Sequence, residues 1–169
     1  LMRKFEKIQT ILLDDGHQHR ALGRNLNIIV TEHQKLYIED QLFPLGNLRE
    51  NKSGSKRANI IVVTKCPKEM SLNEKEKIRS LLSYKKNIMI FFSHIKYQKL
   101  VNCSTNKHVG LNKKIKYFLI TGIASPNSLL EHLYDLKINF FHFKFKDHHY
   151  FKTHELKNLI KKGKNQKIN

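Results

Sequence analysis

The chain alternates short apolar runs with segments in which apolar residues recur at helical spacing. Continuous runs of Ile, Val and Phe, rather than strict alternation with polar residues, are typical of strands that are covered on both faces of a sheet. These runs predict strands at residues 8–13, 27–31, 59–64, 88–92, 117–121 and 138–145.

Segments between the predicted strands have the pattern of amphipathic helices. Ser71–Glu74 has the form of a capping box, in which the Ser hydroxyl and the Glu carboxylate each bind a free backbone amide. Pro126 suits the first turn of a second helix, and Thr153 suits the cap of a third. We expect the inward-facing side chains to be Ile78, Leu81, Leu82, Leu129, Leu130, Leu133, Leu156, Leu159 and Ile160. Strands that alternate with helices predict an α/β fold with a mostly parallel sheet and flanking helices.

Two stretches interrupt this alternation. Residues 42–50 form a connection marked by Pro and Gly, which a Ser, Gly and Lys loop follows, and they suit a domain boundary. Residues 96–116 contain a turn-rich stretch, Asn102–Asn106, between residues that suit the two strands of a hairpin. Residues 163–169 are polar and basic, so we expect them to form a tail that frays.

Composition narrows the class of protein. With 169 residues, 40% of them hydrophobic, the chain is long enough for a core and is not wholly disordered. It contains no apolar run near the ~18–20 residues of a membrane helix, and residues 1–7 lack the apolar core of a signal peptide. Cys66 and Cys103 have no metal-ligand spacing and make no disulfide framework, which favours a reducing, cytosolic setting.

Charge is the strongest bias in the composition, because 32 Lys and Arg against 14 Asp and Glu give a net charge of +18. Such a charge suits a nucleic acid, a nucleotide or an anionic membrane surface. Abundant Lys, scarce Arg and frequent Asn and Ile are also the residue usage of an AT-rich genome, in which Lys accumulates on any solvated surface. The charge therefore favours anionic partners but does not indicate a specific nucleic acid.

The first candidate site is Asp14–Arg20, directly after the first predicted strand. In open α/β sheets, ligands bind beyond the carboxyl ends of the strands. Two adjacent carboxylates there suit Mg²⁺, which prefers one or two carboxylates together with water and substrate phosphates. The alternative, equally weighted on spacing alone, is a solvated turn with two surface histidines. A zinc site through His17 and His19 is disfavoured, because the sequence offers no third ligand nearby.

Three further positions carry candidate chemistry. Asp147 and His148–His149 follow the last predicted strand, where a carboxylate beside an imidazole suits either a general acid or base or a polar surface. Arg49 suits either a phosphate clamp or a solvated loop in which it pairs with Glu50. Lys65, at the end of the third predicted strand, suits either a nucleotide pocket or an ordinary turn. The sequence contains neither a G-x-x-x-x-G-K-[ST] nor a G-x-G-x-x-G loop for phosphate.

Taken together and in order, seven segments resemble the tetraacyldisaccharide 4′-kinases, the kinase family of lipid A synthesis in Gram-negative bacteria, in a form like that of the Bacteroidetes. These segments are Ile11–Arg20, Leu26–Ile28, Pro44–Glu50, Lys56–Pro67, Phe91–Ile95, Thr121–Pro126 and Phe145–Phe151. A single piece such as the Asp-His-His triplet is a weak signal, whereas seven pieces in the same order and spacing are specific.

The resemblance implies an enzyme that uses ATP and Mg²⁺ to phosphorylate the 4′-hydroxyl of a tetraacylated glucosamine disaccharide 1-phosphate, giving lipid IVA. It implies a cytoplasmic location, peripheral at the cytoplasmic face of the inner membrane. It also implies two α/β domains that a two-stranded linker joins, with the active site in the cleft. Residues 1–45 would end the P-loop kinase domain, residues 46–162 would form a Rossmann-like C-terminal domain with the linker hairpin, and residues 163–169 a basic tail.

The family's functional residues carry over onto matching positions of this chain. Asp14 and Asp15 would be the Walker-B-like carboxylates near Mg²⁺, Gln18 would lie in the same metal and phosphate shell, and His19 would complete the motif. Arg49 would contact the anionic substrate. The implication agrees with the chemistry, because phosphoryl transfer depends on placed charge and metal more than on covalent catalysis.

Asp147 and His148 would approach the active site from the other domain, where His148 would orient or tune a general-base Asp. The implied catalytic residues are thus Asp15, His19, Asp147 and His148.

The chain also departs from the family pattern. His17 stands where the family usually has Phe, and Asn51 stands where it often has Pro. The family's Walker A loop, its base and its membrane anchor lie upstream of the position of residue 1, so we expect no kinase activity without an upstream P-loop segment. The alternative function is that of a small basic protein, descended from a degraded kinase, that binds nucleic acid or an anionic surface.

Overall fold

The computed structural model describes residues 9–83 and 88–165 of the chain. Its contacts divide the chain into two compact units, Leu1–Ile95 and Lys96–Asn169, which we describe separately. The expected domain division between residues 45 and 46 stays a prediction. Within the described residues, no helix combines the length and the apolar composition that crossing a bilayer requires.

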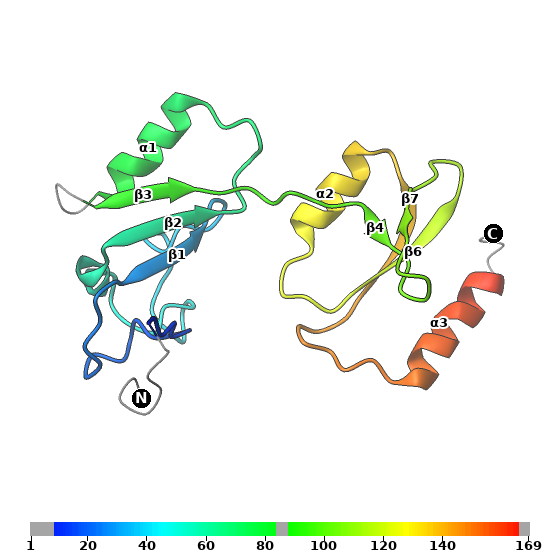
Figure 1. Cartoon of the computed structure of the whole chain (residues 1–169), viewed down its shortest axis with the longest axis horizontal. Helices are drawn as coiled ribbons and strands as arrows, with labels where there is room; N and C mark the ends of the chain where they lie inside the picture. The colour runs from blue at the N-terminus through cyan, green and yellow to red at the C-terminus, as the bar shows by residue number, and fades with distance from the viewer. Residues whose placement is uncertain (1–8, 84–87, 166–169) are drawn as a thin grey trace. The chain divides into compact units, whose positions relative to one another are not determined.

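The first unit is built on a parallel sheet with the strand order β1-β2-β3. The strands are β1 (Ile28–Glu32), β2 (Ile60–Thr64) and β3 (Met89–Phe92), and they confirm the predictions at 27–31, 59–64 and 88–92. Figure 1 shows helix α1 (Leu72–Leu82) running beside the sheet. The Ser71 capping box is confirmed, because the Ser71 hydroxyl accepts from the Glu74 amide and the Glu74 carboxylate accepts from the Ser71 amide.

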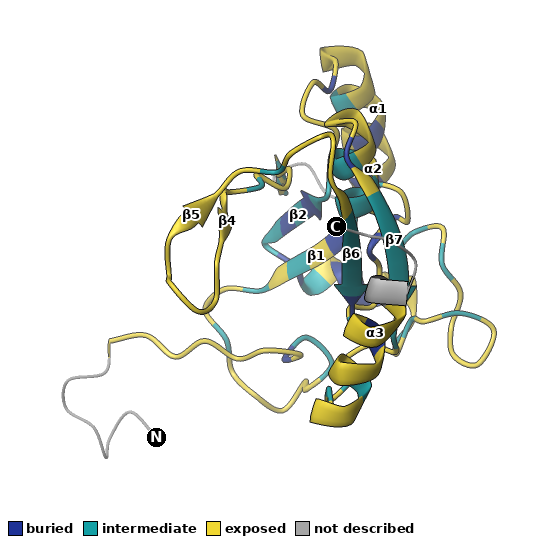
Figure 2. Cartoon of the chain, turned by 90° about the vertical axis from the view of Figure 1, so that its right-hand side faces the viewer, coloured by how far each residue is buried: buried dark blue, intermediate teal, exposed yellow. Residues whose placement is uncertain are grey.

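The core of this unit lies on one face of the sheet. Ile61 and Val63 on β2 are fully buried and pack with Ile78 and Leu82 of α1. Leu36, from the connection between β1 and β2, belongs to the same cluster. In Figure 2 the buried positions are dark blue and the exposed positions are yellow, and both appear on the strands of this sheet.

Two sequence expectations for this unit are wrong. Residues 9–13 form no strand, and Ile11, Leu12 and Leu13 are 47%, 91% and 53% exposed; Ile8 lies outside the described residues. A strand exists through hydrogen bonds to a neighbour, and among the described residues none pairs with this segment. Leu81 is also 58% exposed rather than inward, because the buried stripe of α1 runs through Ile78 and Leu82.

The connection from β1 to β2 contains a short 3₁₀ helix, η2 (Lys52–Arg57), in place of an α-helix. Asn51 caps η2 by accepting a hydrogen bond from the Ser53 amide at 3.0 Å. The Asn that stands where the resembled family often has Pro therefore has a local structural role, because its side chain satisfies a free amide of the first turn.

The second unit contains a second parallel pair, β6 (Lys116–Thr121) with β7 (Asn139–Lys144), which confirms the predictions at 117–121 and 138–145. A short antiparallel hairpin, β4 (Leu100–Val101) with β5 (His108–Val109), confirms the predicted hairpin within residues 96–116. Helix α2 (Asn127–Asp135) follows Pro126, and helix α3 (Thr153–Asn165) follows β7.

Helix α3 differs from its prediction in two ways. It buries Leu159 but leaves Leu156 and Ile160 38% and 57% exposed, so its buried stripe is narrower than expected. The helix also continues to Asn165, whereas the sequence predicted a fraying tail from residue 163; residues 166–169 lie outside the described residues.

The two adjacent leucines at the end of α1 give a direct test of this core. We expect Leu82→Ala to destabilise the first unit by about 2–5 kcal/mol, because Leu82 is 1% exposed and its removal leaves a cavity. The matched control Leu81→Ala should cost less than about 1 kcal/mol, since exposed substitutions rarely cost more. Urea unfolding of the two variants measures the difference, and equal losses would contradict the packing described.

Candidate functional site

The Asp14–Gly16 segment forms a tight turn with both carboxylates exposed to solvent. Asp15 has a positive φ of 51°, and its backbone amide donates to the Asp14 carboxylate at 2.9 Å. Gly16 is buried, and a Cβ there would lie 2.8 Å from the Leu13 side chain, so a larger residue would require that side chain to move. The turn thus presents two neighbouring carboxylates, which are the hard oxygen ligands that Mg²⁺ prefers.

Arg49 lies against this turn. Its Nη1 donates to Asp15 Oδ2 at 2.9 Å, across 34 residues of sequence. The alternative in which Arg49 pairs with Glu50 is therefore not what the structure shows. Both side chains are mostly exposed, at 64% and 73%, so their ion pair contributes little to stability. An arginine and a carboxylate held together in this way remain accessible to an anionic ligand and to a cation.

Glu50 joins the turn segment to η2. Arg57 Nη2 donates to both carboxylate oxygens of Glu50, at 2.7 and 2.9 Å. Arg20 Nη2 lies 3.4 Å from Glu50 Oε2. His17 Nε2 lies 3.3 Å from Glu50 Oε1 and 3.1 Å from the Gly54 carbonyl. Because both neighbours of Nε2 are acceptors, this nitrogen carries the proton in the neutral ring.

The charges around Glu50 set its protonation. Burial raises the pKa of the Glu50 carboxyl, but the hydrogen bond and charge of Arg57, with contributions from Arg20 and His17, outweigh burial. The pKa of Glu50 therefore lies below its ordinary value, and the carboxylate stays ionised near neutral pH. Within the described residues, His17 Nδ1 and Arg57 Nε are buried without a hydrogen-bond partner.

Asp40 lies at the start of the connection that carries Arg49 and Glu50, and its hydrogen bonds stabilise that connection. The Asp40 carboxylate accepts from the Gln41 amide at 2.9 Å and from the Asn47 side chain at 3.1 Å. The side-chain hydrogen bond from Asn47, followed by the Gln41 amide, lowers the pKa of Asp40 to about 2. A Cβ at Gly46 would lie 2.3 Å from the Gln41 carbonyl oxygen, so the close approach within this connection requires glycine.

The cluster attaches to the amino ends of the strands. Arg57 ends η2 just before β2, and its carbonyl accepts from the Asn27 side chain at 3.2 Å just before β1. The sequence placed Asp14 and Asp15 at the carboxyl end of a strand, but that position depended on the strand at 8–13, which does not form.

Lys65 lies at the other end of β2, where its side chain pairs with Glu32 at the end of β1. Its φ of 54° marks a sharp turn out of the strand. The structure therefore brings Asp15 and Arg49 together but places Lys65 at the opposite end of β2 from Arg57.

Gln18 and His19 continue the Asp14–Gly16 turn, with Gln18 half-buried and His19 exposed. The backbone amide of His19 donates to the Gly16 carbonyl at 3.1 Å. Among the described residues, no group of three or more His, Cys, Asp and Glu side chains is arranged to hold a metal ion.

In the second unit, Asp147 and His148 lie in the turn after β7. His148 has a φ of 54°, its ring is 95% exposed, and its Nε2 lies 3.7 Å from the Asp147 carboxylate. The neighbouring His149 is better fixed, because its ring packs between Phe145 and Phe151, with centroid distances of 4.7 and 4.8 Å.

His149 also lies 3.2 Å from Glu155. The Lys152 backbone amide and His149 hold the pKa of the Glu155 carboxyl below its ordinary value. His149 therefore anchors the turn that presents His148.

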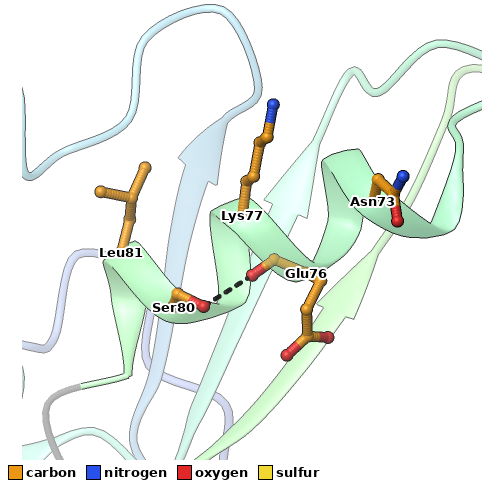
Figure 3. A pocket seen from close by; sticks show the side chains of 5 residues that line it. All are labelled: Asn73, Glu76, Lys77, Ser80 and Leu81. Carbon is orange, nitrogen blue, oxygen red and sulfur yellow. Dashed lines mark hydrogen bonds between the residues drawn. The ribbon is translucent and has the colours of Figure 1, made fainter.

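Two surface hollows lie outside these clusters. Figure 3 shows one along α1, lined by Asn73, Glu76, Lys77, Ser80 and Leu81, with a volume of about 640 Å³. The Ser80 hydroxyl donates to the Glu76 carbonyl there, at 3.0 Å. The other hollow, about 410 Å³, is lined by residues of the connection that carries Arg49, including Leu45, Leu48 and Lys52. Neither hollow is lined by a side chain that the sequence predicted to be functional.

Sequence reasoning missed the contacts that Glu50 makes with Arg57 and with Arg20. Arg57 also donates to the His17 carbonyl at 3.1 Å, across 40 residues. Contacts over such separations have no fixed spacing in the sequence. One sequence signal could have pointed to these contacts. Glu50 is an acidic residue in a strongly basic chain, so cationic neighbours are expected for it.

Comparison with known proteins identifies one family. A family model described as tetraacyldisaccharide-1-P 4′-kinase matches residues 1–168. A tetraacyldisaccharide 4′-kinase of Flavobacterium johnsoniae is 37% identical over 169 residues, covering 99% of this chain and 49% of the relative. The enzymes of that name from Flavobacterium psychrophilum and Bacteroides fragilis are 39% and 35% identical, over 96% and 92% of this chain and 48% and 43% of the relatives. The chain thus spans about half the length of these curated relatives, and no solved structure matches it.

Gly54 gives a test of the Glu50 contacts. A Cβ at Gly54 would lie 2.7–2.9 Å from the Glu50 carboxylate, so Gly54→Ala should push Glu50 away from Arg57. We expect a loss of about 1–2 kcal/mol in urea unfolding, within the range for broken polar networks. The control Gly23→Ala, where a Cβ meets nothing within 4 Å, should change stability by less than about 0.5 kcal/mol. Equal effects of the two substitutions would contradict the described packing.

The lowered pKa of Glu50 also predicts a pH dependence. A carboxyl whose pKa is lower in the folded state stabilises the fold above its ordinary pKa of about 4.3 and loses that contribution as the pH falls further. We therefore expect Glu50→Gln to flatten the loss of stability between about pH 5 and about pH 3. Glu76→Gln, at a carboxylate that is 71% exposed, should leave the slope near that of the unmodified chain. Unfolding midpoints across this pH range measure both slopes.

Proposed function

We propose that this chain, which belongs to the tetraacyldisaccharide-1-P 4′-kinase family, forms part of a lipid kinase. The reaction would transfer the γ-phosphoryl group of ATP to the 4′-hydroxyl of a tetraacylated disaccharide 1-phosphate. The observation that carries the proposal is the 2.9 Å contact between Asp15 and Arg49, which joins two of the segments that resemble the family, Ile11–Arg20 and Pro44–Glu50. The family match over residues 1–168 supports it independently.

The turn at Asp14 and Asp15 supplies the charge that phosphoryl transfer requires. Its two exposed carboxylates, with the Gln18 amide oxygen, would hold Mg²⁺, and the donor set fits because every ligand is an oxygen. Bound there, Mg²⁺ would neutralise phosphate charge as it does in other phosphoryl-transfer enzymes. Arg49 would exchange its contact with Asp15 for a phosphate group of the substrate, two oxygens of which its planar guanidinium can bind through parallel hydrogen bonds.

Glu50, Arg57 and His17 would act as positioning residues rather than as catalytic residues. Arg57 is fixed by its place at the start of β2, and through Glu50 it holds the segment that carries Asp15. Small displacements of charged groups strongly lower the rate of the catalysed reaction, because electrostatic stabilisation of the transition state depends on where those groups lie. The contacts of Glu50 would keep Asp15 and Arg49 in position relative to each other, although Glu50 itself would not touch the substrate.

The remaining candidate residues keep proposed roles in the same reaction. Asp147 and His148 would take part in catalysis, with His148 orienting or tuning the base, and the high exposure of His148 leaves its ring accessible to a partner group. His19 would complete the motif after Gln18. Lys65 would contact the nucleotide by exchanging Glu32 for a phosphate.

Activity of the whole enzyme would require the half that the relatives possess and this chain does not match. That half would supply the phosphate-binding P-loop, since no such loop occurs in this sequence. The net charge of +18 would favour peripheral contact with the anionic cytoplasmic face of the inner membrane, close to the lipid substrate.

The decisive experiment is a transfer assay with radiolabelled ATP and Mg²⁺. We expect no 4′-phosphorylation by the chain alone, but activity when the unmatched half of the Flavobacterium johnsoniae relative is fused before residue 1. In that fusion, Asp14→Ala with Asp15→Ala should lower kcat at least about 100-fold, as removal of a key electrostatic group does. The control Asp135→Ala, at an exposed position of α2, should leave kcat unchanged.

Two results would contradict the proposal. One is 4′-phosphorylation by the chain without the added half, and the other is full activity of the doubly substituted fusion. A basic nucleic-acid binder would respond differently, since removing two negative charges would strengthen or preserve its binding, with steep salt dependence.

A further inference from the structure

One face of the β1-β2-β3 sheet is apolar and uncovered in the described part of the chain. Ile28 and Val30 of β1 are 48% and 64% exposed, and Met89 and Phe91 of β3 are 51% and 53% exposed. Strand pairing aligns Ile28 with Ile60 and Met89, and Val30 with Val62 and Phe91, so these side chains form two apolar rows across the sheet. We call this surface the open face. It consists of Ile28, Val30, Ile60, Val62, Met89 and Phe91.

The topology explains why this face is open. Consecutive parallel strands in the order β1-β2-β3 are joined by crossovers, and crossovers are almost always right-handed. Two right-handed crossovers that proceed in one direction across a sheet must cover the same face. The core agrees with this rule, because Leu36 from the first crossover and Leu82 from the second pack with Ile61 and Val63 in one cluster.

A parallel sheet with one bare face is incomplete, because such sheets are covered on both faces. In doubly wound folds, the second face is covered by segments wound in the opposite direction from the same starting strand. Both crossovers described here lie on the opposite side from the open face, so the covering segments would have to come from another stretch of polypeptide.

We propose that the open face is the docking surface for helices of the half that this chain does not match in its relatives. The inference rests on the proposed function, in which that half completes the enzyme. The relatives supply the required length, because this chain covers only 43–49% of them. A second copy of the chain is a poorer occupant, since each copy carries a charge of +18 and the two would repel each other.

The same proposal accounts for the apolar segment 9–13. Ile11, Leu12 and Leu13 have the composition of a buried strand yet are exposed and unpaired. A docked half that extends the sheet would offer this segment the neighbouring strand that it needs.

Thiol labelling tests the proposal directly. In a Cys103→Ser background, Val30→Cys places a reporter on the open face, and Leu72→Cys, at a position 80% exposed on α1, is the matched control. The labelling rate with a maleimide is measured in the chain alone and in the fusion with the unmatched half of the Flavobacterium johnsoniae relative. We expect the Val30→Cys thiol to react at least tenfold more slowly in the fusion, while the Leu72→Cys thiol reacts equally in both.

Equal labelling of Val30→Cys in the two proteins would overturn the proposal, and Phe91→Cys repeats the test on the other edge strand. Protection already present in the chain alone would also overturn it; if protection increases with protein concentration, a second copy is the occupant. Kinase activity of the fusion separates the two proposals. An active fusion with an unprotected open face rejects only the docking surface, whereas a protected but inactive fusion rejects only the proposed function.

Discussion

Strand β2 pairs with β1 on one side and with β3 on the other, and the first unit depends on this central position. Ile61 and Val63 are fully buried because β2 has neighbours on both edges and α1 over one face. Removal of two such side chains from water contributes several kcal/mol, of order 2 kcal/mol each. Arg57 precedes this strand and Lys65 follows it, so the backbone of both residues is held next to a firmly packed strand.

The candidate site is built outward from the start of that strand. Arg57 holds Glu50, Glu50 lies against His17, and the segment of His17 presents Asp15 to Arg49. The inner contacts are half-buried and the outer contact is exposed. A buried charge that loses its partner is costly, whereas an exposed ion pair exchanges readily with ligands. This increase in solvent exposure from the inner to the outer contacts suits a site in which the contacts of Glu50 stay fixed while Asp15 and Arg49 exchange partners.

The sequence predicted the elements whose signals are local. The Ser71 capping box and the Ile-Val run of β2 specify their structures through neighbours a few residues away. The same reasoning failed for residues 9–13, because a strand also needs a partner that no local pattern reveals. It could not separate Leu81 from Leu82, since adjacent positions on a helix both lie near the buried stripe. The motif order identified Asp15 and Arg49, but their contact spans 34 residues and that of Arg57 with the His17 carbonyl spans 40, so both required the fold.

The open face has a practical consequence for handling the chain in solution. Electrostatic repulsion at a charge of +18 keeps copies dispersed when the ionic strength is low. At about 0.15 M salt the screening length falls to about 8 Å, and exposed apolar surface and unpaired strand edges then promote precipitation. The salt washes that strip nucleic acid from basic proteins therefore work against the colloidal stability of this chain. Dilute protein in buffers of low ionic strength is the condition that opposes its aggregation most strongly.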